Sequence, residues 1–592
     1  MNRPSPSRLS IVSALITLIA ACALLLAGCG GGGGGGSSST AASSGGGSGS
    51  GGGTGGTGGG ITYGTTCFSG SGTVTPGQQT PDADLSSPWP PAPCAPPVAC
   101  SEALTGTHAT YNVGASIPAG APAGTNYPDM TSMPWLSLQA GDVVNIYPGT
   151  YKTKVALSAQ GTASAPVIIN GVTDASCNRP IVEAAGAVTA DDAKAKGFFT
   201  GSGGSIIEGE GAFVLWWNDS LTPDNFGFKP SFIAIQNLQI QDANSGQTYV
   251  NSAGSTVNWA TDASGVYAVV SSVLTVQNCL IINNGEGVFV NSKNNDGLPY
   301  PNAETSFYVT LRGNSIYNNG VVNSYTEHNV YVQGVRSLYE GNYIGQLIPN
   351  AQGGSLKDRS SGPVVRFNSI LAAARAIDLV DNEGGSPGVA ADPVYKYGWI
   401  YGNLIVNGQN GSGDLIHWGG DSTEYNLYHQ GPLSVYFNTI VNTIPTAIFD
   451  MSMATQSVNS YSNIISSTQS LAMCTASAQD GSQVGAVNLY DKNWIQAGFD
   501  PTGATQNNGV AQCTFSNHGA LLAGSPVLTA TYGLDPGSPA IGAGISYPVT
   551  SPVAPVSVAN LIPTYQPATT ASGTPTYVAR STVKDVGAFA GP

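Results

Sequence analysis

The sequence has few charged residues: only 9% of its 592 residues are Asp, Glu, Lys or Arg, against 41% apolar residues and 79 glycines. Helix surfaces are usually built from Glu, Lys, Arg and Ala, so this scarcity favours strands and tight turns over helices. It also excludes a coiled coil and a highly charged disordered chain. The 34 acidic residues outnumber the 19 basic ones, and the net charge of -15 argues against nucleic acid as a partner.

Several cofactor motifs are also missing. The sequence contains no paired CxxC and no HExxH. Its long glycine tract has neither a strand before it nor a helix after it, so the tract is no phosphate-binding loop. The sequence therefore offers no redox, zinc or nucleotide motif of these types.

The N-terminus has the layout of a secretory leader. Two basic residues, Arg3 and Arg8, precede an apolar stretch from Ile11 to Ala27 that is too short for a stable membrane span. The stretch runs into Leu-Ala-Gly-Cys, which resembles the bacterial lipobox. We therefore predict a lipoprotein signal peptide over residues 1–28, lipidation of Cys29, and an exported chain anchored to a bacterial membrane, at the outer membrane or the cell surface.

A low-complexity segment follows the leader. Residues 30–60 comprise 19 Gly, 10 Ser or Thr and 2 Ala, a composition that cannot bury an apolar core. We predict a disordered tether over residues 29–62, with a root-mean-square span of about 30 Å.

Seven cysteines remain beyond position 29. Export permits disulfides, but an odd number leaves one thiol over. Cys279 lies in the apolar run from Leu274 to Ile282, so we interpret it as a free core thiol. Spacing does not determine connectivity, and the one pair that we predict is Cys474 with Cys513, because both lie in the C-terminal region.

A short apolar segment followed by Asn recurs along the chain, for example as GNSIY, FNSIL and GNLIV. Successive asparagines are 41, 36, 28, 26, 35, 35 and 25 residues apart, as expected for one solenoid coil plus side loops. Period-2 alternation marks the segments as strands. Stacked coils place equivalent asparagines about 4.8 Å apart, where their amides can hydrogen-bond. The asparagines that we interpret as this structural ladder are Asn237, Asn278, Asn314, Asn342, Asn368, Asn403, Asn438 and Asn463.

Segments near both ends of this repeat region resemble known proteins. Residues 140–171 resemble the opening coils of the chondroitinase B-like and alginate lyase families of the pectate-lyase-like superfamily, and GSPAIGAG (537–544) and DVGAFAG (585–591) resemble closing motifs of secreted bacterial β-helix proteins. The resemblance implies an all-β fold, a right-handed single-stranded parallel β-helix with a cap at each end. The predicted boundaries are 63–135 for a Pro-rich N-terminal cap, 136–470 for the β-helix and 471–592 for the C-terminal cap.

The strand after each asparagine turn can be aligned by its inward apolar positions. This alignment places Tyr331, Lys357 and Asp378 on successive coils, about 4.8 Å apart. It turns His417 inward, and we interpret that residue as a core histidine. The first outward column contains Phe289, Tyr331, Lys357, Asp378 and Ile416, and the second contains Asn291, Gln333, Arg359, Val380 and Trp418.

Basic residues gather in the same region. Six lie between positions 312 and 375, where an even spread would give about two. In an acidic protein this concentration indicates either a surface for a carboxylated or sulfated polymer or a set of solvated turns. The six are Arg312, Arg336, Lys357, Arg359, Arg366 and Arg375.

The spacing around Lys357 resembles the catalytic region of the chondroitinase B-like lyases. In that family two acidic calcium ligands precede the catalytic lysine by seven and five residues, and an arginine follows about a coil later. Here Asn350 and Gln352 take the acidic positions, and Asp378 and Asp381 stand where the arginine would be. Amide oxygens bind calcium more weakly than carboxylates do. The cofactor is therefore undetermined, with calcium an open expectation and Asn350, Gln352 and Asp381 its candidate ligands.

The resulting expectation is β-elimination of a uronic-acid-containing polysaccharide. Elimination removes a proton next to a carboxylate, so the site must neutralise that carboxylate, supply a base and protonate the leaving oxygen. A guanidinium fork suits the carboxylate. The predicted roles are Lys357 as base, Arg359 with Arg336 or Arg375 as the carboxylate clamp, Tyr331 or His328 as acid, Asp378 as a further catalytic group, and Gln333 and Trp418 as substrate-binding residues.

Two other functions stay open. Glycoside hydrolysis requires two carboxyl groups about 5–9.5 Å apart, and the nearest cluster is Asp378, Asp381 and Glu383, although the polygalacturonase signatures NTD and GHG are absent. The other is that of a non-catalytic, rod-shaped protein that binds glycans through aromatic rings such as that of Trp418. The expected partner is a polysaccharide, acidic in the case of elimination. The expected state is a monomer that contacts the membrane only through its lipid anchor.

Overall fold

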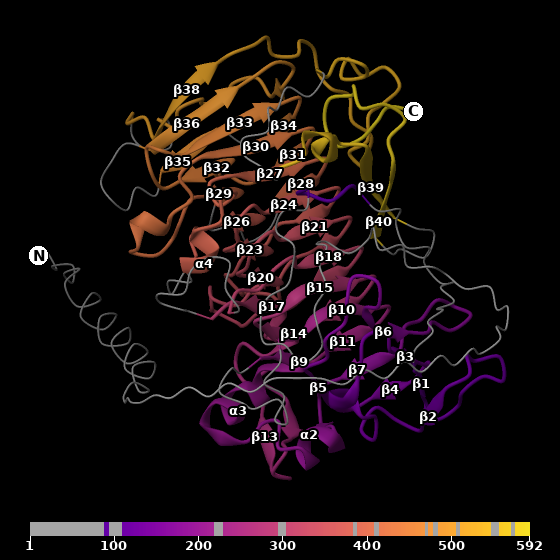
Figure 1. Cartoon of the computed structure of the whole chain (residues 1–592). Coiled ribbons are helices and arrows are strands. Elements are labelled where there is room, and N and C mark those ends of the chain that lie inside the picture. Colours follow the sequence, from indigo (N-terminus) through magenta and orange to yellow (C-terminus); the bar gives the residue numbers. More distant parts are fainter. Residues whose placement is uncertain are drawn as a thin grey trace, which may run out of the picture. The chain divides into compact units, whose positions relative to one another are not determined.

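The computed structural model describes residues 88–93, 109–217, 229–293, 304–382, 387–407, 414–467, 472–476, 484–504, 509–545, 556–569 and 575–592. Nearly all of its regular elements are strands, and these form three long sheets (Figure 1). The predicted signal peptide, Cys29, the tether and Glu383 lie outside the described residues. In the part that is described, no helix is long and apolar enough to cross a membrane.

The first sheet is parallel throughout and has 14 strands among the described residues. In spatial order they are β2 (Thr125–Tyr127), β1 (Thr110–Val113), β3 (Val143–Ile146), β6 (Val167–Gly171), β10 (Ser231–Gln236), β15 (Ser272–Gln277), β18 (Thr310–Arg312), β21 (Leu338–Glu340), β24 (Val364–Arg366), β27 (Gly398–Tyr401), β30 (Pro432–Tyr436), β33 (Ser457–Tyr461), β36 (Val484–Leu489) and β38 (Cys513–Asn517).

The second and third sheets run beside the first. In spatial order the second contains β37 (Trp494–Ile495), β34 (Ile464–Ser467), β31 (Thr439–Asn442), β28 (Leu404–Asn407), β25 (Ser369–Leu371), β22 (Tyr343–Ile344), β19 (Ser315–Tyr317), β16 (Leu280–Ile282), β11 (Gln239–Gln241), β7 (Ile181–Glu183) and β4 (Thr150–Tyr151). The third contains β13 (Thr256–Asn258), β12 (Thr248–Val250), β8 (Ala187–Thr189), β5 (Thr153–Leu157), β9 (Gly211–Trp216), β14 (Ser264–Val269), β17 (Glu286–Asn291), β20 (Val330–Val332), β23 (Leu356–Asp358), β26 (Ile377–Leu379), β29 (Ile416–Trp418), β32 (Phe449–Met451) and β35 (Cys474–Ala476).

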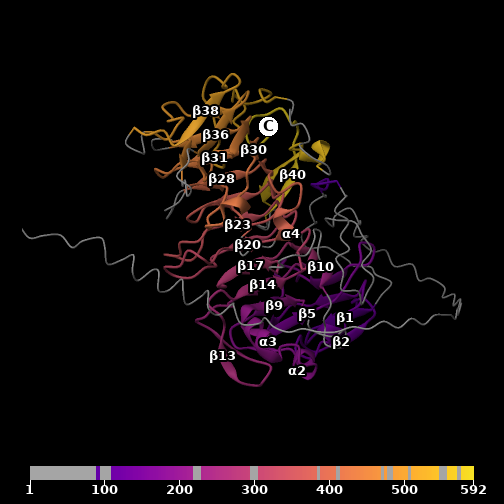
Figure 2. The ribbon, with the colours of Figure 1, turned by 60° about the vertical axis from the view of Figure 1, so that its left-hand side comes forward.

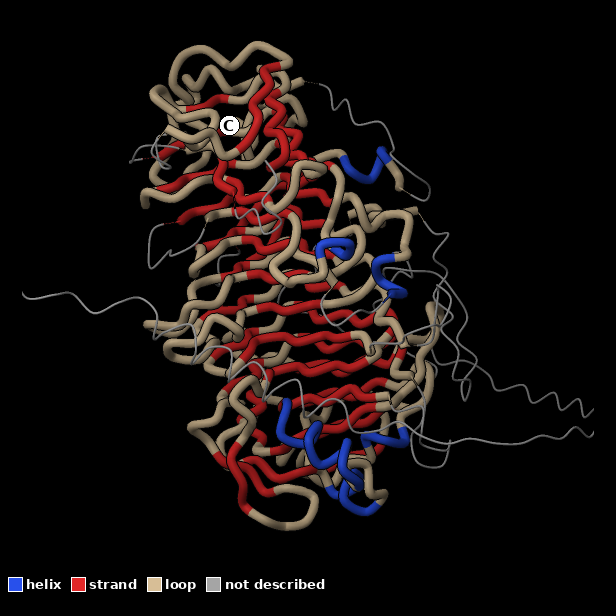
Figure 3. The backbone as a smooth tube through the Cα atoms, turned by 90° about the vertical axis from the view of Figure 1, so that its left-hand side faces the viewer, coloured by secondary structure: helices blue, strands red, loops and turns tan. Residues whose placement is uncertain are grey.

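Each coil of the chain contributes one strand to each sheet in turn. Strands β18, β19 and β20 make one coil, and β21, β22 and β23 stack on it in parallel register. Figures 2 and 3 show the strands of successive coils lying one above another. The predicted parallel β-helix is therefore confirmed. The short helices are α2 (Asp191–Ala195), α3 (Gly201–Ile207) and α4 (Pro387–Ala390), with 3-10 turns η2 (Trp135–Ser137), η3 (Glu208–Glu210), η5 (Tyr425–Leu427) and η6 (Val558–Leu561).

The asparagine ladder is present over six of the eight predicted positions. From Asn314 to Asn463, each side-chain amide donates to the side-chain oxygen of the next asparagine at 2.9–3.0 Å. Asn463 then donates to Asn493, which the sequence pattern had not included. All of these side chains are buried, so each hydrogen bond between side-chain amides replaces one that water would otherwise make.

The first two predicted members occupy a different position. Asn237 and Asn278 sit one residue before the ladder column, where Asn278 donates to Asn237 and Asn237 donates to Asn170. The ladder position of that coil is taken by Cys279, whose backbone N–H donates to the side-chain oxygen of Asn314 at 2.9 Å. Cys279 is free and fully buried, as predicted.

The residue before each ladder position has a left-handed backbone. Its φ is +62° at Gly313, +64° at Gly341, +60° at Phe367 and +66° at Gly402. Glycine adopts this region without steric cost, whereas Phe367 is held there by its coil. This bend turns the chain from the first sheet into the second, and it explains why Gly-Asn and Phe-Asn pairs recur in the sequence.

The interior of the coils is one continuous apolar cluster, built from residues such as Ile316, Val332 and Ile405. The predicted disulfide between Cys474 and Cys513 is present and joins the third sheet to the first.

A two-stranded antiparallel hairpin, β39 (Tyr565–Thr569) and β40 (Pro575–Ala579), packs back against the coils. The ring of Tyr577 lies so close to Gly341 that a Cβ on that glycine would sit 2.1 Å from it. The hairpin therefore depends on a glycine at this turn.

Candidate active site

One outward row runs along the third sheet. The strand register pairs Phe289 with Tyr331, Tyr331 with Lys357, and Lys357 with Asp378. These residues come from β17, β20, β23 and β26, and their order and spacing are those of the predicted first column. Successive coils thus bring a phenol, an amine and a carboxyl group side by side.

The next member of the row differs from the prediction. Asp378 pairs with His417, and His417 with Asp450, whereas Ile416 and Trp418 are fully buried in the interior cluster. The prediction was wrong by one position because it aligned Leu415 with Ile377, whereas the register pairs Ile416 with Ile377. Leu415 and Ile416 both belong to the interior cluster, so either could have been taken as the inward residue. Trp418 donates its indole N–H to the carbonyl of Gly431, so its predicted place in a substrate-binding column is wrong, as is the inward orientation of His417.

Lys357 lies within a cluster of carboxylates. Its Nζ is 2.6 Å from Oδ2 of Asp421 and 3.5 Å from Oδ2 of Asp378. Asp421 comes from the loop after β29, 64 residues further along the chain. This contact could not be predicted from the sequence, because the loop has no strand pattern from which a register could be read.

Arg375 lies at the centre of a second group. Its guanidinium is 3.3 Å from Asp378, 3.0 Å from Nδ1 of His417 and 2.9 Å from Asp450. His417 Nδ1 is also 2.7 Å from Asp378, and its Nε2 is 3.1 Å from the hydroxyl of Ser452. With 26% of its side chain exposed, Arg375 is far more accessible than Arg359, at 4%.

Arg359 supports the loop that carries Asp421. It donates to the carboxylate of Asp421 at 2.9 Å and to the carbonyl of Asp381 at 2.8 Å. The carboxylate of Asp381 in turn accepts the backbone N–H of Asp421 and the hydroxyl of Ser422. Arg359 is therefore a buried positioning residue, which contradicts its predicted role as the carboxylate clamp.

The candidate calcium ligands do not form a site. Asn350 and Gln352 are exposed, and Asp381 is fully buried with both carboxylate oxygens engaged. Within the described ranges, no group of three or more His, Cys, Asp or Glu side chains is arranged to hold a metal ion. The residues present do not fit calcium, and we derive no step through it.

A pocket of about 230 Å³ opens over this cluster. His328 lies on its wall, and its Nδ1 accepts the backbone N–H of Gly354 at 2.8 Å, which leaves the ring proton on Nε2. Burial, assisted by Lys357, lowers the pKa of His328 to about 3, so the ring is neutral. The lining residues are Tyr325, His328, Gln352, Gly354, Lys357, Ala374, Arg375, Asp378 and Asp421.

Tyr331 is held by stacking. Its ring centroid is 5.1 Å from that of Phe289 and 5.9 Å from that of His328, and the guanidinium of Arg359 lies 5.8 Å from it. Stacked rings cover one another's faces. The aromatic row therefore stabilises the sheet and offers ring edges, not faces, to a ligand.

Several predicted residues lie away from the pocket. Arg336 is buried against Asp392 and the hydroxyl of Tyr308, and the amide of Gln333 donates to Asn382 at 2.6 Å. Both are therefore structural, contrary to their predicted roles in substrate binding. The other two basic residues, Arg312 and Arg366, lie on the first sheet with Glu340. The basic cluster of the sequence is split because residues a few positions apart in one coil face different sheets.

The carboxyl groups of the site have opposite tendencies. Burial opposes ionisation of Asp378, but Lys357, His417 and Arg375 outweigh it and hold the pKa of Asp378 well below its usual range. Asp414, which precedes β29, is the reverse case. Burial and then the nearby Asp450 raise its pKa to about 7. A carboxyl group with a pKa of about 7 and one with a pKa well below its usual range thus occur on neighbouring coils.

Comparisons with known proteins give distant structural similarity alone. No family model matches the sequence, and no curated protein matches it significantly. Similar solved structures include pectate lyase Pel9A (14% identity, 77% of this chain and 89% of that chain, TM-score 0.35). A DFA-IIIase from Arthrobacter chlorophenolicus A6 (12%, 64% and 88%, 0.34) and the PL6 alginate lyase AlyGC (14%, 70% and 57%, 0.31) are also similar. At these TM-scores the fold rests on the three sheets described above.

Proposed function

We propose that this protein cleaves a polysaccharide at the pocket around Lys357, by β-elimination next to a uronic acid. The observation that carries the proposal is the placing of Lys357, Asp378 and Arg375, from separate strands and turns, around one accessible pocket. Perturbed carboxyl groups beside such a pocket are typical of a catalytic site.

Arg375 binds the substrate carboxylate in this proposal. It lines the pocket, and its exposed guanidinium can form a bidentate contact. Lys357 takes the proton from the carbon next to that carboxylate, the neighbouring carbon–oxygen bond breaks, and a carbon–carbon double bond forms. The departing oxygen takes a proton from a solvent water molecule, and the hydroxide left behind is neutralised by the proton that Lys357 took up. The Nε2–H of the neutral His328 supports the departing oxygen as a hydrogen-bond donor.

The resting site imposes a condition on this reaction. Lys357 is paired with Asp421 and Asp378, so its ammonium must lose a proton before the amine can act as a base. Asp421, 2.6 Å away, is the neighbouring acceptor, but a carboxylate is a much weaker base than an amine. Elimination is therefore expected to depend on the release of Lys357 from this pairing.

Glycoside hydrolysis is the second candidate, favoured by the opposite tendencies of Asp414 and Asp378. A protonated Asp414 would serve as general acid and an ionised carboxylate as base or nucleophile. Because the pKa of Asp414 is raised to about 7, hydrolysis is expected to decline above that pH. The two reactions thus depend on different residues, elimination on Lys357 and hydrolysis on Asp414.

Incubation with alginate, pectate and a glycosaminoglycan between pH 5 and pH 9 tests the proposal. Ultraviolet absorbance from the new double bond that is abolished in Lys357→Ala supports elimination. New reducing ends without that absorbance, lost above neutral pH and in Asp414→Asn, support hydrolysis instead. Lys396→Ala is the matched control, because Lys396 is exposed and outside the pocket lining. Binding of these polymers without product would leave the non-catalytic alternative.

Export and lipid anchoring through Cys29 belong to the same proposal and are supported by the leader pattern alone. Radiolabelled palmitate should be incorporated by the wild-type chain and not by Cys29→Ala. Unlabelled wild-type chain released into the medium would contradict the anchor.

A further inference from the structure

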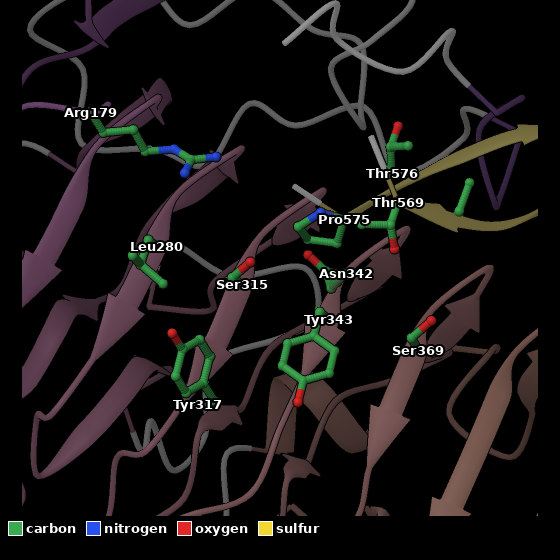
Figure 4. A pocket seen from close by; sticks show the side chains of 11 residues that line it. Arg179, Leu280, Ser315, Tyr317, Asn342, Tyr343, Ser369, Thr569, Pro575 and Thr576 are labelled. Atoms are coloured by element: carbon green, nitrogen blue, oxygen red, sulfur yellow. The ribbon is translucent and has the colours of Figure 1, made fainter. Parts of the chain in front are cut away.

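A second cavity lies on another side of the β-helix. It occupies about 560 Å³ between the outer face of the second sheet and the β39–β40 hairpin (Figure 4). This volume lies within the range of about 300–1,000 Å³ that ligand sites occupy. None of its lining residues is shared with the pocket around Lys357.

Two tyrosines form the aromatic part of this cleft. Tyr343 on β22 lies along its strand, because a Cβ at Gly345 would come 3.0 Å from Cε1 and 3.1 Å from the hydroxyl of Tyr343. The glycine therefore lets the ring rest on the sheet instead of standing out from it. Tyr317 on β19 meets it edge-on, with 5.9 Å between centroids and 68° between planes. Both side chains are half-buried, so part of each remains accessible from the cleft that they line.

Hydroxyl groups surround these rings. Ser315 and Ser369 flank Tyr343 in the register of the second sheet, and Thr569 and Thr576 face them from the hairpin. Among the described residues, the hydroxyls of Ser315, Ser369 and Tyr343 have no hydrogen-bond partner. A cleft that combines aromatic surface with several uncommitted hydroxyls matches the two kinds of surface on a sugar ring.

The charge of the cleft is low. Arg179 is the one charged residue among the described residues that line it, and its Nε and Nη2 both bond to Asn278 at 2.8 Å. No cluster of cations is available to bind phosphate or sulfate. The lining therefore suits a hydroxyl-rich ligand more than a strongly anionic one.

The roof of the cleft is fixed before any ligand arrives. Tyr577 of β40 packs against Gly341 and Phe367, and its hydroxyl is 3.5 Å from Glu340. Tyr565 of β39 packs edge-on against Tyr577 at 5.2 Å. A preformed cleft reduces the ordering cost of binding.

We propose that this cleft is a second, non-catalytic polysaccharide-binding site, in which a short stretch of the polymer packs against Tyr343 and Tyr317 and hydrogen-bonds to the surrounding hydroxyls. The identity of the polymer, though not the binding itself, rests on the proposed function. A site on a different sheet would hold a long chain while the pocket around Lys357 acts on another part of it.

The test is affinity electrophoresis of the full chain in gels that contain alginate, pectate or a neutral glucan. All variants carry Lys357→Ala, so that the polymer stays intact. Tyr343→Ala is expected to weaken retention about tenfold, the size of one aromatic contact, and Tyr343→Phe to keep it within about twofold. Tyr127→Ala, which removes a half-buried tyrosine on β2, is the matched control and should bind normally.

The outcomes separate this proposal from the preceding one. Retention that depends on Tyr343 supports the second site even if the wild-type chain turns nothing over. If the wild-type chain cleaves the polymer and Tyr343→Ala leaves retention unchanged, the second site is refuted and the proposed enzymatic activity stands. The second site is also refuted if no polymer in the panel retains the protein. A change of oligomeric state in Tyr343→Ala would refute it as well, since the cleft would then bind a second copy of the chain.

Discussion

Replacing Glu340 by Gln should destabilise the protein strongly. Glu340 on β21 is fully buried between Arg312 on β18 and Arg366 on β24, at one register position of the first sheet. Its carboxylate pairs with Nε of Arg312 and, at 2.6 Å, with Nη2 of Arg366. The amide of glutamine has nearly the same shape, so the substitution removes the charge and deprives two buried guanidinium groups of the carboxylate that they share.

The magnitude follows from the number of pairs that are broken. Removing one partner of a buried ion pair costs about 3–5 kcal/mol, because the other charge stays buried. Here one carboxylate serves two cations, so we expect the upper part of that range. Arg366 also donates to the carbonyls of Pro91 and Asn560, so the loss should loosen the C-terminal segment that holds the hairpin.

Urea unfolding followed by circular dichroism, together with limited proteolysis near the hairpin, measures this effect. Glu424→Gln, at an exposed position, is the control. Replacing all three charged residues by Met, Leu and Met should recover most of the stability, since well-packed apolar groups often match a buried ion network. A loss below about 1 kcal/mol in Glu340→Gln would refute the reasoning.

The same variant has a pH signature. Burial raises the pKa of Glu340, but Arg366 and Arg312 outweigh it, and the net effect is a pKa below the usual value of 4.5. A depressed carboxyl pKa contributes stability above the unfolded value, which is lost as the pH falls through the folded value. The difference in the free energy of unfolding between wild type and Glu340→Gln should therefore decrease as the pH falls below 4.5.

Three further changes test the fold and the site. Asn368→Ala should cost about 2–4 kcal/mol in urea unfolding, because it leaves Asn342 and Asn403 without their ladder partner; a loss as small as that of an exposed Asn→Ala would contradict the ladder. Cys474→Ser should lower stability by about 2–4 kcal/mol, and dithiothreitol should abolish the difference from wild type; a difference that persists in the reductant would show another cause. Asp414→Asn should stabilise the protein by about 1–3 kcal/mol at pH 8, less at pH 5 and not below the usual carboxyl pKa of 3.8, because the raised pKa of Asp414 makes its ionisation unfavourable in the folded chain; equal effects at all three pH values would refute this.

The predicted row Tyr331, Lys357 and Asp378 depended on local information alone. Each residue stands at a set distance from an apolar pair, and parallel strands of adjacent coils align such pairs. The prediction failed one coil later, where Leu415 and Ile416 are both interior and the register pairs Ile416, not Leu415, with Ile377. Two adjacent apolar residues allow two alignments, and local alternation does not choose between them.

Asp421 could not be predicted in the same way. It reaches Lys357 from a loop, and the position of that loop is set by Arg359 and Asp381, which lie on two other coils. Asp414 and Asp450 likewise meet Arg375 only after the coils have stacked. The predicted role of Arg359 was wrong for the same reason, because the residues that it binds, Asp381 and Asp421, are distant from it in the sequence.

The amino-acid sequence by itself determined the repeating coil, because a buried asparagine, a left-handed turn residue and alternating apolar positions are local requirements that every coil must meet. It also determined the interior position of Cys279. Only the tertiary structure decided which charges meet, since side chains on loops and on three differently oriented sheets are brought together by stacking, and stacking adds contacts between residues that no local pattern connects.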